Sequence, residues 1–402
     1  MGQHKEVFRF KDLYRFDGFR FAEAFLVEDS IIVSLKRVRR TGTCPCCGKR
    51  CSSIHSRRQR RIRDLDVATS TVYLEFITYE VVCRCGYEGW EQLGFCDDYS
   101  RYTTRFEERV VIFCTKMTVK DAAAEMHISW NAAKNIDKKN IRKYLVPLDE
   151  VIPRRIGVDE IAYQIGQNYL TVVRDVDLKK VIWVGEGRKK ETLDGFFIAL
   201  GMEKSWNIRV AVLDMWDPYI ASIRAHTDAA LVFDKFHIAK AVNAAVDIVR
   251  RHEFSKADYT ERKEMKHKRF LILARQERLN PSEKETLNDL LQLNKQLYKA
   301  YLLKEQLLDI FDEENLATAE KRLRQWITNI HAAAITPLIS VAKTIQHYWQ
   351  GILNYFTYRI TNAQSEGFNN KINILKRRAY GFRDLEYFKL KIMQSCGIVS
   401  SK

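Results

Sequence analysis

The segment IRVAVLDMWDPYIASIRAHTDAALVFDKFH, residues 208–237, decides the fold. Two apolar runs in it, IRVAVLDMW and AALVFDKFH, are typical of strands, and DPYIASIRAH between them is typical of a short helix. Upstream lie the helical segment ETLDGFFIALGMEK and, before it, three strand-like segments, RRIGVDEIAY, NYLTVVRDVD and KKVIWVGEG. Three strands, a helix, a strand, a helix and a strand indicate an α/β domain.

The chain changes to helix after this segment. Residues 238–350 are leucine-rich at helical spacing and contain only two prolines. One of them, Pro281, follows Asn280 and precedes Glu283, which is the pattern of a capped helix start. We therefore predict an all-α insertion at 238–350, inside an α/β domain made of 151–237 and 351–402.

The charge predicts the partner. The chain has 402 residues and a formal net charge of +16, which favours a polyanion, and nucleic acid first. The apolar runs are far short of a membrane span, and MGQHKEVFRF lacks the features of a signal peptide. We expect a cytoplasmic, nucleoid-associated protein with no membrane partner. In a reducing compartment, nine cysteines favour metal ligation over a disulfide framework.

The cysteines predict a zinc module within residues 1–100. Cys44 and Cys47 form a CxxC pair, Cys83 and Cys85 form a CxC pair, and both pairs lie beside glycine. Four thiolates from two such turns suit tetrahedral Zn²⁺, which would hold a module this small together. Buried free cysteines are the simpler alternative. Three further residues could replace one ligand: Cys46, Cys51 and His55.

A strongly basic stretch surrounds the first pair. Residues 36–63 contain eleven Lys or Arg and no Asp or Glu, and TVYLEFITYEVV at 71–82 follows as a clear strand. Such a cluster could merely keep the surface soluble, but its charge favours contact with DNA phosphates. The candidate DNA-binding residues are Arg57, Arg58, Arg60, Arg61 and Arg63.

Residues 101–150 predict a helix-turn-helix. In MTVKDAAAEMHISWNAAKNIDKKNIRKYL (117–145), VKDAAAEM would form the first helix and SWNAAKNIDKKN the recognition helix, capped by Ser129. An ordinary helical hairpin is the alternative. Ala122, Ala123 and Met126 would pack against Ala133 and Ile136. The residues expected to face DNA are Trp130, Asn131, Lys134 and Lys138.

Three carboxylates are candidate metal ligands. Asp159 and Asp214 each end an apolar strand, and on neighbouring strands they would lie side by side at one sheet edge. A later helix could bring Glu366 over the same edge. Gathered carboxylates repel each other unless a cation separates them, and oxygen ligands select Mg²⁺ or Mn²⁺. A two-metal carboxylate site cleaves phosphodiesters.

That later helix is TNAQSEGFNNKINILKRRAYGF, residues 361–382. At helical spacing, Glu366, Asn370, Asn373 and Arg377 share one face, and Phe368, Ile372, Leu375 and Ala379 share the opposite, packing face. A solvated polar face is the simplest interpretation. With Glu366 as a metal ligand, Asn370 and Arg377 would orient it or touch DNA, together with Lys376 and Arg378.

The chain resembles an insertion-sequence transposase of the ISL-three family over nearly its whole length. The segments that carry the resemblance are TCPCCG with HSRRQRRIRDL, the helix-turn-helix, GVDEIAY, VLDMWDPY, VFDKFH and SEGFNNKINILKRRAYGFRDLEYFKLKI. The resemblance implies a DDE-type catalytic domain of RNase H-like fold. It implies that Asp159, Asp214 and Glu366 are the catalytic triad, with Asp234 and His237 in support near the site.

The resemblance also implies a bacterial protein that binds the terminal inverted repeats of its element and a target DNA, as a homodimer or higher oligomer. Two alternatives are open. One is a transposase-derived DNA-binding regulator without catalytic activity, and the other is a structure-selective nuclease with the same core. Two DNA-binding modules suit recognition of a defined terminal sequence better than recognition of a junction.

Overall fold

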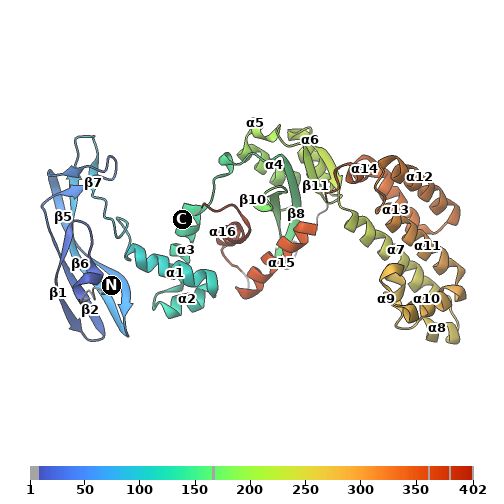
Figure 1. Cartoon of the computed structure of the whole chain (residues 1–402), viewed down its shortest axis with the longest axis horizontal. Coiled ribbons are helices and arrows are strands. Elements are labelled where there is room, and N and C mark those ends of the chain that lie inside the picture. Colours follow the sequence, from blue (N-terminus) through green and yellow to red (C-terminus); the bar gives the residue numbers. More distant parts are fainter. Residues whose placement is uncertain (1–8, 165–167, 361–362, 380–381, 401–402) are drawn as a thin grey trace, which may run out of the picture. The chain divides into compact units, whose positions relative to one another are not determined.

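The structure is a computed structural model that describes residues 9–164, 168–360, 363–379 and 382–400, with residues 363–366 described as helix without their side chains. The chain divides into two compact units, residues 1–143 and 144–402 (Figure 1). Within the described residues, no helix has the length and apolar content needed to cross a bilayer.

The first unit begins with a short 3-10 helix, Phe10–Tyr14, and a five-stranded sheet. The sheet order is β1-β2-β6-β5, with β7 also paired to β6. Its strands are β1 (Phe19–Val27), β2 (Ser30–Arg37), β5 (Ile54–Val67), β6 (Ser70–Val82) and β7 (Glu88–Trp90). The prediction of a strand at 71–82 is confirmed. Two short strands, β3 (Gly42–Thr43) and β4 (Arg50–Cys51), form a separate hairpin.

Strand β5 contains the basic segment 56–63, for which the sequence predicted charge but no secondary structure. It pairs antiparallel with β6 over most of its length. Arginines stand on both faces of the strand, so the apolar alternation that signals a strand is absent. Apolar residues of β6 fill the core beneath, with Val72 and Leu74 fully buried.

Three helices follow in the first unit: α1 (Thr104–Lys116), α2 (Val119–Glu125) and α3 (Trp130–Tyr144). A fully buried carboxylate, Asp64 of β5, joins the sheet to α1. It accepts a 2.7 Å hydrogen bond from the hydroxyl of Thr103, the N-cap of α1, and pairs with the guanidinium of Arg105.

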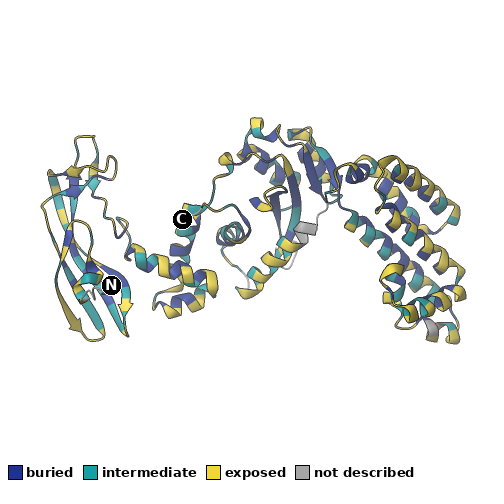
Figure 2. Ribbon diagram, in the orientation of Figure 1, coloured by how far each residue is buried: buried dark blue, intermediate teal, exposed yellow. Residues whose placement is uncertain are grey.

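The second unit is built on a five-stranded sheet of order β10-β9-β8-β11-β12. Its strands are β8 (Arg155–Gln164), β9 (Asn168–Asp175), β10 (Lys180–Glu186), β11 (Val210–Leu213) and β12 (Ala230–Phe233). The first three are antiparallel neighbours, whereas β11 runs parallel to both β8 and β12. This is the predicted order of strands and helices, except that the single helix predicted at 191–204 is divided into two at Gly201, whose φ is +88°. Figure 2 shows these strands as largely buried.

Helices occupy the rest of the second unit. Those around the sheet are α4 (Lys190–Leu200), α5 (Met202–Ser205), α6 (Asp217–His226), α15 (Ala363–Arg378) and α16 (Leu385–Cys396). Those between β12 and α15 are α7 (Lys235–Lys256), α8 (Tyr259–Met265), α9 (Arg269–Leu273), α10 (Pro281–Leu293), α11 (Lys295–Ile310), α12 (Leu316–Ala333), α13 (Thr336–His347) and α14 (Trp349–Tyr358). Two short 3-10 helices, Leu148–Glu150 and Gln276–Arg278, complete the unit.

The helical region begins and packs as its sequence predicts. The capping box is present at the start of α10, where Asn280 and Glu283 each accept a hydrogen bond from the other's backbone. The apolar core runs without a break from the sheet into these helices. Helix α14 packs against β12, and Gly351 lies so close to Phe233 that an added Cβ would meet its ring at 2.3 Å. The division into a domain and an insertion at 238–350 stays a prediction.

Candidate active site

The structure brings Asp159 and Asp214 to the same edge of the sheet. Strands β8 and β11 run parallel, and Gly157 pairs with Val212. Each aspartate lies two residues further along from that pair, so the two carboxylates leave the sheet at the same level on neighbouring strands.

The surroundings of Asp159 disfavour the ionised form of its carboxylate. Burial raises its pKa, and the negative charge of Asp214 raises it further. Two hydrogen bonds act in the opposite direction: the side-chain amide of Asn369 donates to Oδ2 over 2.7 Å, and the backbone N–H of Glu160 donates to Oδ1 over 2.8 Å. The group is therefore held in a fixed orientation beside a second negative charge, where a cation would be favoured.

Asn369 reaches Asp159 because α15 packs on the sheet beside β8. Ile372 is fully buried and Phe368 is half-buried, both in one apolar cluster with Ile161. The ammonium of Lys376 donates to the carbonyl oxygen of Ala162 over 3.0 Å. Ile372 therefore lies on the packing face that the sequence predicts.

The residue that contacts Asp159 is Asn369, one position before the Asn370 that the sequence analysis favoured. Asn370, Arg377 and Arg378 are exposed on α15. The side chain of Glu366 lies outside the described residues. Its position in α15 is three residues before Asn369, which places the two positions on the same side of the helix.

His237 lies beside the second aspartate, and Asp234 is the N-cap of the helix that carries His237. Nδ1 of His237 lies 3.0 Å from Oδ1 of Asp214, and both atoms are buried. The interaction with Asp214 raises the pKa of His237, which favours the protonated form that would pair with this carboxylate. The carboxylate of Asp234 caps α7 by accepting from the N–H of Phe236 over 3.1 Å. This cap fixes the first turn of α7, which carries His237.

A buried arginine lies beneath the carboxylates. Arg174 of β9 is only 2% exposed, and it pairs across the strands with Gly157 of β8. An added Cβ on Gly157 would meet the guanidinium of Arg174 at 2.5 Å. Burial lowers the pKa of Arg174, and the charges of Asp159 and Asp234 oppose that shift. Gly157 therefore leaves space for the guanidinium of Arg174, whose positive charge interacts with the carboxylates of Asp159 and Asp234.

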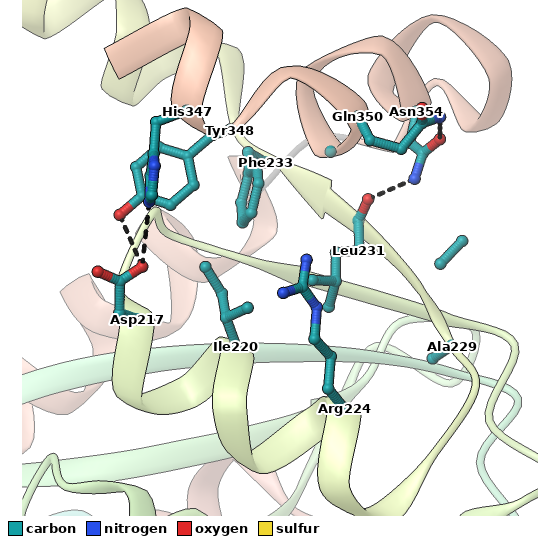
Figure 3. Close-up of a pocket in the computed structure, with 12 residues that line it drawn as sticks. Asp217, Ile220, Arg224, Ala229, Leu231, Phe233, His347, Tyr348, Gln350 and Asn354 are labelled. Carbon is teal, nitrogen blue, oxygen red and sulfur yellow. Dashed lines mark hydrogen bonds and ion pairs between the residues drawn. The ribbon is translucent and has the colours of Figure 1, made fainter. Parts of the chain in front are cut away.

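Asp217, close to Asp214 in sequence, has a structural role. It lies on a cavity of about 340 Å³ lined by α6, β12 and the α13–α14 region (Figure 3). Its Oδ1 accepts a 2.9 Å hydrogen bond from the hydroxyl of Tyr348 and lies 3.8 Å from Nε2 of His347. Neither Asp159 nor Asp214 lines this cavity.

The four predicted zinc ligands form a cluster. The sulfur atoms of Cys44, Cys47, Cys83 and Cys85 all lie within 4.8 Å of one another. The Cys44–Cys85 and Cys47–Cys83 pairs are 3.6 Å and 3.5 Å apart. A tetrahedron with Zn–S bonds of about 2.3 Å has edges of about 3.8 Å, so the spacing fits Zn²⁺. Among the described residues, no group that includes Cys46, Cys51 or His55 has such a spacing.

Some arginines of the basic strand contact other parts of the first unit, and others are exposed. Arg58 lies 3.8 Å from the ring centre of Trp90 and pairs with Asp98 at 2.7 Å. Arg60 donates to the backbone oxygens of Asp97 and Ser100, and buried Arg63 pairs with Asp66. Two arginines are exposed, Arg57 and Arg61, and the second of these also pairs with Glu75.

The helix-turn-helix forms as the sequence predicts. Ser129 accepts a hydrogen bond from the N–H of Ala132 at the start of α3. The apolar residues expected between the helices share one core: Ala122, Ala123, Met126, Ala133 and Ile136. Trp130 is 45% exposed and Asn131 is exposed. The ammonium of Lys134 lies 4.9 Å from the Trp130 ring centre, and Lys138 is half-buried.

Comparison with known proteins matches three regions of the chain in the same order. Residues 40–85 match a zinc-finger of the transposases IS204, IS1001, IS1096 and IS1165. Residues 91–139 match the helix-turn-helix domain of transposase family ISL3, and residues 156–392 match the DDE transposase domain of that family.

Two curated relatives span most of the chain. The transposase for insertion sequence element IS1001 of Bordetella parapertussis is 31% identical over 368 residues, which cover 90% of this chain and 91% of the relative. The transposase for insertion sequence element IS1557 of Mycobacterium tuberculosis is 27% identical over 370 residues, which cover 85% and 82%. The zinc finger, the helix-turn-helix and the DDE domain define the class of protein as a transposase. The chain belongs to the transposase family ISL3.

Two residues at the carboxylate edge, Asn369 and Arg174, were not predicted from the sequence. Asn369 stands between Phe368 and Asn370 in a run of polar residues, and only the packing of α15 distinguishes it. The signal for Arg174 was present, because it is a lone cation within the apolar strand NYLTVVRD.

Proposed function

We propose that this protein binds the ends of its insertion sequence and catalyses metal-dependent cleavage and transfer of DNA strands. The observation that carries the proposal is the alignment of Asp159 and Asp214 on parallel neighbouring strands, with α15 and its Glu366 position beside β8. The sheet order and strand directions also support an RNase H-like fold for this domain.

The residues at this edge fit Mg²⁺ or Mn²⁺. The donors are carboxylate oxygens, which such ions prefer. Oδ1 of Asp214 is buried, and its close polar neighbour among the described residues is Nδ1 of His237 at 3.0 Å, so the carboxylate keeps lone pairs that a cation could use. Asp159 and Asp214 would hold the ions with Glu366. When bound, a pair of such ions activates water or a 3′-hydroxyl and stabilises the leaving oxygen.

The remaining residues position these acids. Asn369 fixes Oδ2 of Asp159, so the other lone pairs of this carboxylate keep a constant direction. His237 beside Asp214 offsets part of its negative charge before DNA and cations arrive. Arg174 does the same for Asp159 from inside the fold.

In this proposal the first unit recognises the sequence of the DNA, and both units contact its phosphates. Exposed Trp130 and Asn131 at the start of α3, together with Lys134 and Lys138, would meet DNA bases and backbone. Arg57 and Arg61 of β5 would bind phosphates, and so would Arg377 and Arg378 of α15. Zn²⁺ on the four cysteines would be structural. Because an element has two ends, we propose a dimer or higher oligomer on DNA.

The test uses a labelled duplex that carries one end of the protein's own element, incubated with the full chain and Mg²⁺. We expect a nick at the element boundary and none in EDTA. Specific binding without a nick under any divalent cation would instead support a DNA-binding regulator derived from a transposase.

A further inference from the structure

The loop between β10 and α4 holds Arg188 in a fixed backbone position. Gly187 has a φ of +97°, which few other residues adopt. Its N–H donates to the carbonyl oxygen of Tyr169 over 2.8 Å, and its own carbonyl oxygen accepts from the hydroxyl of fully buried Thr171 over 2.8 Å. The carbonyl oxygen of Arg188 accepts from Nε1 of Trp216 over 3.0 Å. Three hydrogen bonds, two to β9 and one to Trp216, therefore fix the backbone from which the Arg188 side chain extends.

The side chain of Arg188 is supported by aromatic rings. Its guanidinium lies 4.1 Å from the ring centre of Tyr169 and 5.1 Å from that of Trp216. Among the described residues, the nearest carboxylate oxygen is Oε1 of Glu160, which is 3.9 Å from Nη1 and too far for a hydrogen bond. Within the described residues, the guanidinium makes no hydrogen bond. Its N–H groups are therefore held in position and remain available to donate to a ligand.

Arg188 lies at the carboxylate edge. Trp216 follows Asp214 by two residues, and Glu160 follows Asp159 directly. Burial raises the pKa of Glu160, the charges of Asp214 and Asp159 raise it further, and Arg188 opposes the shift. Successive strand residues point to opposite faces, so Glu160 leaves β8 on the face opposite to Asp159. Arg188 therefore lies on the Glu160 side of β8, whereas α15 packs on the side of Asp159.

We propose that Arg188 binds a phosphate of the DNA strand next to the phosphodiester that is cut. An arginine stacked on aromatic rings presents a planar fork of donors, which matches phosphate geometry. The stack covers the ring faces turned toward Arg188, so a phosphate suits the site better than a stacked base. The inference rests on the proposed DNA cleavage, since it names a contact that this site makes to its substrate.

The test removes charge from the protein and from the DNA separately. End duplexes are made with a single neutral methylphosphonate at each phosphate near the cleaved bond in turn. Equilibrium binding and nicking are measured for the wild type, Arg188→Gln, Arg188→Lys and the matched control Lys189→Gln, whose exposed side chain lies in the same loop. Loss of one charge-assisted contact is expected to cost about 10- to 100-fold.

We expect one or two phosphates where the methylphosphonate weakens the wild type but has no further effect on Arg188→Gln. Arg188→Lys should keep part of this sensitivity, and Lys189→Gln should keep all of it. If Arg188→Gln retains the wild-type sensitivity at every phosphate, the inference is wrong. Failure of the wild type to nick unmodified DNA would instead refute the proposed cleavage, and the binding measurements would still decide whether Arg188 contacts a phosphate.

Discussion

The side-chain amide of Asn369 donates a hydrogen bond of 2.7 Å to Oδ2 of Asp159, although 209 residues separate the two in sequence. This contact joins α15 to β8 at the point where β8 meets the parallel strand β11. It fixes the direction of one carboxylate and places the helix that carries Glu366 beside it. The site is therefore assembled by packing of a late helix on an early strand.

Replacing Asn369 by Ala should lower the nicking rate by about 10- to 100-fold, because a hydrogen bond to a charged group is lost. The hydrogen bond from Asn369 lowers the pKa of Asp159, so its loss raises that pKa further. Since Asp159 must be ionised to hold a cation, the acidic limb of the pH–rate profile should move to higher pH. Asn370→Ala, one position along the same helix and exposed, is the control. Equal losses in both variants would contradict the assignment.

Replacing Gly157 by Ala should destabilise the fold by about 1–3 kcal/mol, as overpacking of a core does. The new Cβ would meet the guanidinium of buried Arg174 at 2.5 Å. Thermal unfolding measures the change. The control is Gly195→Ala in α4, where the nearest atom is 3.9 Å away and alanine favours the helix. An unchanged melting temperature for Gly157→Ala would show that Arg174 lies elsewhere.

Replacing Cys47 by Ser should abolish stoichiometric zinc binding, and the neighbouring exchange Cys46→Ser should not. Cys47 belongs to the cluster of four sulfur atoms, whereas Cys46 is exposed and outside it. Elemental analysis of protein purified without chelator should give about one Zn²⁺ per chain for the wild type and Cys46→Ser. Loss of zinc in Cys46→Ser would show that Cys46 is a zinc ligand in place of one of the four clustered cysteines.

Replacing Arg57 by Gln should weaken binding to all duplex DNA and make the slope of log affinity against log salt shallower by about one. Its side chain is exposed on β5. Arg58→Gln, at the next position, removes a stack on Trp90 and an ion pair with Asp98, so we expect mainly a lower melting temperature. Salt titrations that give both variants the wild-type slope would exclude a phosphate contact by Arg57.

The edge of the sheet could be predicted because it depends on local signals. Apolar runs that end at Asp159 and Asp214 are visible in the sequence, and the order of elements implies that their strands are neighbours. The cluster of four cysteines was likewise predictable, because the CxxC and CxC turns are visible in the sequence and their thiolates suit tetrahedral Zn²⁺.

Other features depend on packing that no local pattern reveals. The choice of Asn369 over Asn370 follows from how α15 rotates on the sheet, which Ile372 and Phe368 set through their contact with Ile161. The basic strand β5 was missed because arginines replace its apolar alternation. Their structural partners, such as Trp90 for Arg58, lie on other segments.

The most direct test of the catalytic proposal is nicking of a labelled element end in Mg²⁺ by Glu366→Gln, Asp159→Asn and Asp214→Asn. Each exchange keeps size and polarity and removes one negative charge, so folding and DNA binding should persist. We predict that each variant loses several orders of magnitude in nicking rate, about 10³-fold or more, because the metal ions are no longer held. A double variant should be little worse than a single one, since the three acids act as a unit. Wild-type nicking by Glu366→Gln would contradict the account and require a different third carboxylate.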